Sequence, residues 1–229
     1  MTTMTKPIFF LIFILSWFLV ISPAYAETNT STVNVQEKLI SLYLSEIQSE
    51  SGQHGGQCKS YLQLKLAHVA RKAGIKASDG KAIYMPRNDT SIGRNTYQWS
   101  GLGNSFQQID QVVMANFKEA TLYKKALSDM LQQIKAGDFL QFVWCPSRSI
   151  CKKGRETLHT IVFNKDFSDP LNWSDSNGIG KEKVHSGTLY PYTKRKAEKT
   201  VSSLINALSK QGCKNCGATL YRLRHDVKN

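Results

Sequence analysis

The chain has 229 residues, which is long enough for one ordinary domain with a buried core. Its composition is strongly basic, with 30 lysines and arginines against 17 aspartates and glutamates and a formal charge of +13. Such a charge favours anionic partners. Beyond the N-terminal region no apolar stretch is long enough to span a membrane, which excludes a protein with several membrane-spanning helices.

Residues 1–26 have the three parts of a secretory signal peptide. Lys6 supplies a positive charge, the stretch from Ile8 to Ile21 is almost wholly apolar, and Ala24-Tyr25-Ala26 forms a small-x-small cleavage site. We therefore expect a periplasmic or secreted protein whose mature chain, 27–229, is a single domain without a stable membrane span. The alternative is an uncleaved N-terminal anchor. Because the protein is expected to be exported, nucleic acid is the least expected anionic partner. Phospholipid headgroups and an acidic cell-wall polymer are expected before it.

The five cysteines divide into two local pairs and one remaining residue. Cys145 and Cys151 form the first pair, and Cys213 and Cys216 form the second. In an oxidising compartment, pairs this close in the sequence predict two short disulfides, which leaves Cys58 as a free thiol. The alternative is a zinc site built on the four paired cysteines, which export disfavours. We expect no metal and no organic cofactor.

The first half of the chain has mainly helical patterns. Apolar residues recur at helical spacing from Val35 to Ile47 and from Cys58 to Ala73, which predicts two amphipathic helices. Glycine and turn-forming residues are frequent over 77–105, which predicts a long loop. Two further helices are predicted over 106–117 and 122–134.

The second half has mainly strand patterns. The segments 139–144 and 158–163 are apolar and rich in β-formers, which predicts an antiparallel hairpin. A short third strand is predicted over 172–177, a helix over 194–210 and a last strand over 219–224. Because helices come first and an antiparallel sheet second, the predicted fold class is α+β.

Several residues in this pattern could carry nucleophilic chemistry. Cys58 ends a Gly-Gly-Gln-Cys run and begins a predicted helix, where backbone amides stabilise a thiolate. His159 lies in a predicted strand and could accept and return the proton, and Asp175 or Asn177 on the next strand could orient the imidazole. Gln57 is a candidate side-chain donor to an oxyanion.

The order of these short motifs resembles that of a known enzyme group. Gly56-Gln57-Cys58 at a helix start, Ala136-Gly137-Asp138-Phe139 before a strand, and His159-Thr-Ile-Val-Phe163 are similar to the CHAP and NlpC/P60 groups of papain-like cysteine amidases and peptidases. Asp175 and Asn177 stand two residues apart, like the acidic residue and asparagine that often follow the histidine in CHAP domains. The resemblance covers roughly Cys58 to Asn177.

The resemblance implies a papain-like NlpC/P60-type core, in which the helix that begins at Cys58 packs on an antiparallel sheet carrying His159. It implies hydrolysis of an amide bond in peptidoglycan through a thioester on Cys58. His159 would be the general base and acid, and either Asp175 or Asn177 would orient it. The implied partner is peptidoglycan or its stem peptides. The sequence leaves open whether an inhibitor protein is a further partner.

Two features depart from the family pattern. Cys58 and His159 are further apart than usual, which we attribute to an insertion around 77–133. Lys59-Ser60-Tyr61 replaces the aromatic residue often found just after the cysteine. Three other functions fit the sequence: a secreted cysteine protease or deamidase acting on a protein, a non-catalytic binding or inhibitor domain with Cys58 buried or paired, and a zinc module using the other four cysteines.

Overall fold

In the computed structural model, every described residue belongs to one compact unit, 33–229. The expected signal peptide, 1–26, lies outside the described residues. In the described part of the chain, no helix is long and apolar enough to cross a membrane. The described segments are 34–49, 58–84, 104–145, 157–177, 183–186, 200–210, 213 and 215–229, with only the backbone described at 58, 60, 157, 176, 177 and 183–186.

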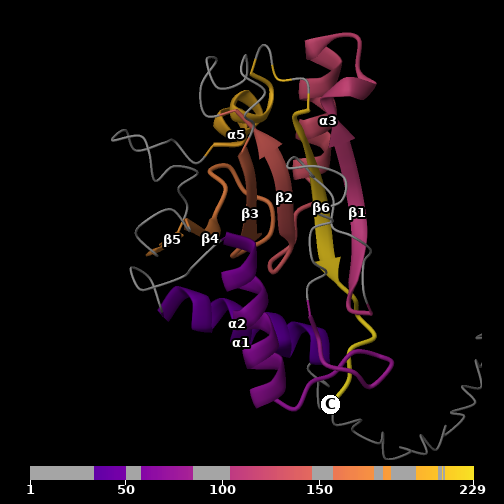
Figure 1. Cartoon of the computed structure of the whole chain (residues 1–229), viewed down its shortest axis with the longest axis vertical. Helices are drawn as coiled ribbons and strands as arrows, with labels where there is room; N and C mark the ends of the chain where they lie inside the picture. The colour runs from indigo at the N-terminus through magenta and orange to yellow at the C-terminus, as the bar shows by residue number, and fades with distance from the viewer. Residues whose placement is uncertain are drawn as a thin grey trace, which may run out of the picture. The chain divides into compact units, whose positions relative to one another are not determined.

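The described residues form one antiparallel sheet and several helices (Figure 1), which confirms the α+β class. The strand order is β1-β6-β2-β3-β4-β5, and each strand is antiparallel to its neighbours. The strands are β1 (Phe106–Val113), β2 (Phe139–Trp144), β3 (Thr157–Phe163), β4 (Trp173–Asn177), β5 (Lys183–Ser186) and β6 (Gly217–Leu223). The helices are α1 (Val35–Ser49), α2 (Cys58–Lys72), the short 3-10 helix η2 (Met114–Asn116), α3 (Ala120–Leu131) and α5 (Val201–Leu208).

Helices cover both faces of the sheet, and β2 shows how side chains divide between them. Phe139 packs in one hydrophobic cluster with α1 and α2, whereas Leu140 and Phe142 pack in a second cluster with α3 and α5. Because successive side chains of a strand point to opposite faces, α1 and α2 cover one face and α3 and α5 cover the other. We call these the α1–α2 face and the α3–α5 face. Figure 1 shows α1 and α2 near one end of the strands and α3 and α5 near the other.

The turn before β2 requires glycine at position 137. Gly137 has a φ of +82°, and a Cβ atom there would lie 2.7 Å from the Ile40 side chain of α1. Both the backbone conformation and the lack of space disfavour any larger residue. The Ala136–Phe139 motif, which contributes to the family resemblance, therefore has a structural role in bringing α1 close to the sheet.

A buried ion pair follows that turn. Asp138 is 0% exposed and accepts hydrogen bonds from Arg222 Nε at 2.8 Å, from Arg222 Nη2 at 2.7 Å and from the Lys135 backbone nitrogen at 2.8 Å. Burial raises the pKa of Asp138, and the guanidinium opposes that shift. Arg222 Nη2 also donates to the Gln133 carbonyl at 2.7 Å. The pair therefore ties β6 to the segment between α3 and β2.

The first two predicted helices are confirmed as α1 and α2, and the helix predicted over 122–134 is confirmed as α3. The helix predicted over 106–117 is wrong, because 106–113 forms the edge strand β1. Its pairing with β6 shifts register between Gln108 and Asp110, and this irregularity interrupts the alternation that would have marked a strand. The expected insertion around 77–133 thus supplies an edge strand of the sheet and a core helix.

In the second half of the chain, the predicted hairpin is confirmed as β2 and β3, and the next two predicted strands as β4 and β6. The helix predicted over 194–210 is confirmed from Val201, and residues 194–199 lie outside the described part. Thr200 caps this helix, since its hydroxyl accepts from the Ser203 backbone nitrogen at 3.1 Å. The four-residue strand β5 was not predicted.

Candidate active site

His159 lies on β3, where the register places it opposite Phe142 of β2. The two rings meet edge to face, with centroids 5.5 Å apart and an interplanar angle of 79°. The His159 side chain is 12% exposed, so the imidazole is enclosed but still reaches solvent. Packing against the neighbouring strand therefore restricts the orientation of the ring.

His159 is hydrogen-bonded to Asp175 of β4. Its Nε2–H donates to Asp175 Oδ2 at 2.8 Å, and the Asp175 side chain is 1% exposed. The ring nitrogen carries the proton because a carboxylate only accepts. The β3–β4 register pairs Ile161 with Asp175, which makes Asp175 a diagonal neighbour of His159 on one face. The side chain of Asn177, the other candidate orienting residue, lies outside the described part.

The second oxygen of Asp175 has a different environment. Asp175 Oδ1 is buried and has no hydrogen-bond partner among the described residues. On the next strand, β5, the register places His185 opposite Asp175. Two histidine positions therefore lie on the strands to either side of one carboxylate. A carboxylate next to an imidazole stabilises its positively charged form.

Cys58 is the first residue of α2, as predicted. Its side chain lies outside the described part of the chain, and so does Gln57. The body of α2 packs against β3 and β4, the strands that carry His159 and Asp175. The helix and the two strands of the predicted site are therefore neighbours.

The face of the sheet that α2 covers is not the face that carries His159. Leu62 and Leu66 of α2 share a hydrophobic cluster with Val162 of β3, which assigns α2 to the α1–α2 face. His159 is three residues from Val162, so strand alternation directs it to the α3–α5 face, as it does Asp175. The sheet therefore lies between the body of α2 and the His159–Asp175 pair. A thiol at the start of α2 can reach the imidazole only past an end or an edge of the strands.

Sequence reasoning missed several buried polar residues on the α1–α2 face of the same strands. Thr160 Oγ1 donates to Gln141 Oε1 at 2.5 Å, and both residues are buried, as is Ser174. Lys59, which follows Cys58, is also buried. The alternation of β2 and β3 could have identified Gln141 and Thr160, but only once the face covered by α2 was known.

No family model, no curated protein and no solved structure matches the chain. The resemblance to CHAP and NlpC/P60 enzymes thus rests on the order of short motifs in this sequence. Membership of that family stays a prediction.

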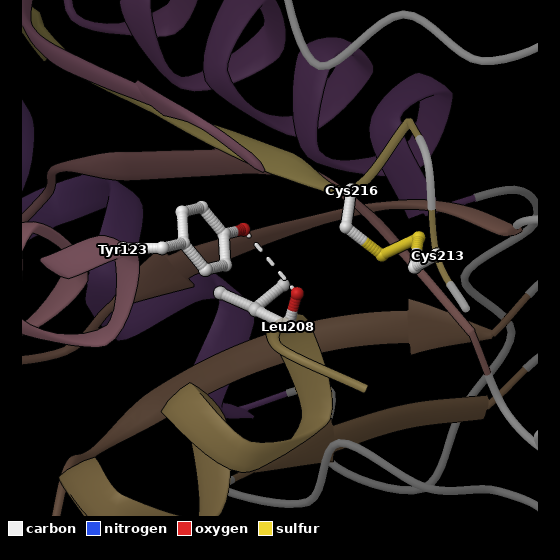
Figure 2. The surroundings of a disulfide bond; sticks show 4 residues. All are labelled: Tyr123, Leu208, Cys213 and Cys216. Atoms are coloured by element: carbon white, nitrogen blue, oxygen red, sulfur yellow. Dashed lines mark hydrogen bonds between the residues drawn. A yellow bond between two sulfur atoms is a disulfide. The ribbon is translucent and has the colours of Figure 1, made fainter. Parts of the chain in front are cut away.

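The three described cysteines of the second half are oxidised. Cys213 and Cys216 form a disulfide with Cα atoms 5.5 Å apart (Figure 2). Cys145 is buried and also disulfide-bonded. Its predicted partner, Cys151, lies outside the described residues, so the Cys145–Cys151 pairing stays a prediction.

Proposed function

We propose that the chain is a secreted cysteine amidohydrolase or endopeptidase with a papain-like core, which cleaves an amide bond in peptidoglycan. The observation that supports this proposal most is the 2.8 Å bond between His159 Nε2 and Asp175 Oδ2, on strands against which the helix beginning at Cys58 packs. The formal charge of +13, of which Lys6 of the expected signal peptide contributes one, suits an anionic polymer outside the cytoplasm.

In the proposed reaction, His159 accepts the thiol proton of Cys58 on Nδ1 while its Nε2–H stays bonded to Asp175. The thiolate attacks the amide carbonyl carbon, and backbone N–H groups at the start of α2 donate to the resulting oxyanion, with Gln57 as a further donor. The C–N bond breaks as His159 returns the proton to the leaving amine, and a thioester remains on Cys58. Water that gives its proton to His159 then releases the carboxylic acid and the thiol.

This reaction sets a geometric requirement. Because His159 faces away from the body of α2, the Cys58 sulfur must come past the strands and approach Nδ1 to hydrogen-bond reach, roughly 3 Å. Only the first turn of α2 could satisfy this requirement, since the later turns pack on the α1–α2 face. The coupling between thiol and imidazole can be measured in solution.

The test is the pH dependence of Cys58 alkylation by iodoacetamide in the mature, oxidised protein. A thiol coupled to His159 should titrate below the ordinary cysteine pKa of ~8.5. His159→Gln should move this titration back toward ~8.5. His68→Gln removes an exposed histidine from α2 and should leave the titration unchanged. Identical profiles for wild type and His159→Gln would refute the catalytic pair.

The position of the sheet between α2 and His159 favours a second candidate function, that of a non-catalytic binding domain. In such a domain the His159–Asp175 bond would only hold β3 to β4. If the chain is a binding domain of this kind, the native protein should bind peptidoglycan while Cys58 stays unreactive toward iodoacetamide across the pH range.

A further inference from the structure

Three cysteines from two distant parts of the chain meet in one buried cluster. The Sγ atoms of Cys145, Cys213 and Cys216 all lie within 4.8 Å of one another, and all three side chains are buried. The β2–β6 register explains this meeting, because it pairs Val143 with Gly217. Cys145 follows the end of β2, and Cys216 precedes the start of β6. The sheet therefore brings together sulfur atoms that the sequence places in separate pairs.

The cluster has the chemistry of a soft metal site. Zinc prefers thiolate ligands in a tetrahedral arrangement, and a Zn–S distance of ~2.3 Å places the sulfur atoms roughly 3.8 Å apart. Cys145 Sγ already lies within 4.8 Å of the other two sulfur atoms. Cys213 and Cys216 are bonded to each other, so reduction and side-chain rotation must first separate their sulfur atoms to the spacing that zinc requires. Cys213-Lys-Asn-Cys216 has the Cys-x2-Cys spacing of zinc ligands. The partly buried Met114 packs against the cluster and adds no competing charge.

All three cysteines are oxidised in the structure. We propose that reduction converts this cluster into a binding site for a soft divalent metal ion such as zinc, with Cys145, Cys213 and Cys216 as three thiolate ligands. A dithiol reductant gives two electrons to each disulfide, each disulfide becomes two thiols, and the reductant forms its own disulfide. The metal ion then displaces one proton from each of the three ligand thiols. The proposal does not depend on the hydrolase function.

The metal-bound form joins parts of the fold that the Cys213–Cys216 bond leaves separate. That disulfide closes a loop within one short segment. A metal ion held by Cys145 as well would link the end of β2 to the segment before β6. Since the ion binds the folded state, it should raise the melting temperature of the reduced protein by several degrees.

The experiment uses the mature chain, reduced with a phosphine under anaerobic conditions, freed of reductant and titrated with Co²⁺. One Co²⁺ per chain should produce a near-ultraviolet thiolate-to-cobalt charge-transfer band and the visible bands of a tetrahedral site, and Zn²⁺ should abolish both. Cys145→Ser should weaken binding by more than the roughly 10- to 100-fold that loss of an outer-shell partner costs. Cys58→Ser is the matched control, because it removes a thiol outside the cluster.

Two outcomes would overturn the proposal. One is reduced wild-type protein that gives no charge-transfer band with Co²⁺. The other is a band that persists in Cys145→Ser but disappears in Cys58→Ser, which would assign the metal to a different thiol set. Thermal melting of reduced wild type with and without Zn²⁺ provides an independent measurement that needs no variant. An unchanged melting temperature at saturating Zn²⁺ would contradict the proposal as well.

Discussion

Arg222→Met tests how much the fold depends on the buried ion pair between β6 and the turn before β2. The substitution keeps most of the apolar stem but removes both bonds to Asp138 and the bond to the Gln133 carbonyl. Asp138 would then stay fully buried with a single hydrogen bond, from the Lys135 backbone nitrogen. Removing one partner of a buried pair costs about 3–5 kcal/mol, because it leaves an uncompensated charge. The Arg222 side chain is 25% exposed, so we expect the lower end, about 3 kcal/mol.

The pH dependence of this loss identifies its cause. Burial raises the pKa of Asp138 in the wild type, and loss of the guanidinium should raise it further. A carboxyl group whose folded-state pKa is raised contributes stability that is fully present below its unfolded-state pKa of ~3.9 and is lost as the pH rises through the folded-state pKa. The destabilisation by Arg222→Met should therefore be large at neutral pH and much smaller near the unfolded-state pKa.

Urea unfolding followed by tryptophan fluorescence measures the loss of stability at neutral pH and near the unfolded-state pKa. The double variant Asp138→Asn/Arg222→Met is the control, since it removes both charges and should regain most of the loss at neutral pH. A loss below about 1 kcal/mol at neutral pH, the range of an exposed pair, would show that Asp138 and Arg222 do not act as a buried ion pair. An equal loss at both pH values would show that packing rather than charge is responsible.

Three other predictions concern single contacts. If the proposed hydrolase is active, Asp175→Asn should lower turnover roughly 10²- to 10⁴-fold without unfolding the protein, and unchanged turnover in a cell-wall digest would remove Asp175 from the mechanism. Gly137→Ala should destabilise the fold by about 2 kcal/mol or more, because it combines a left-handed backbone with a Cβ 2.7 Å from Ile40. Thermal unfolding measures the loss of stability, and an unchanged melting temperature would contradict the turn geometry. Tyr123→Phe removes the 3.2 Å hydrogen bond from the Tyr123 hydroxyl to the Leu208 carbonyl, which joins α3 to α5 (Figure 2). The free energy of unfolding, measured in urea, should fall by about 1 kcal/mol, and a rise would contradict this role of the bond.

The elements with strong periodicity could be predicted from the sequence. The apolar spacing of α1 and α2 predicts two helices, and the mostly apolar, β-rich sequence of β2 predicts a strand. The edge strand β1 could not be recognised, because its register shifts between Gln108 and Asp110 and only part of it is buried. A four-residue strand such as β5 carries too few residues for a pattern, and its pairing with β4 depends on the finished sheet.

The order of the candidate site residues along the chain could be predicted, but the face of the sheet on which they lie could not. The spacing of His159 and Asp175 placed both residues on neighbouring strands, but the choice of Asp175 as hydrogen-bond partner required the β3–β4 register. Alternation groups His159 with Ile161, yet which helices cover that face follows from tertiary packing alone. The cysteine cluster shows the same limit, because proximity in sequence predicts local pairs and says nothing of their meeting at the β2–β6 junction.

The most direct test of the proposed function is a digest of purified peptidoglycan by the mature, oxidised protein beside its Cys58→Ala variant, with products identified by mass spectrometry. We expect new muropeptides from the wild type and none from the variant, and their masses would identify the bond that is cut. Muropeptides released equally by Cys58→Ala would contradict the cysteine mechanism. The absence of products from both proteins would contradict peptidoglycan as the substrate.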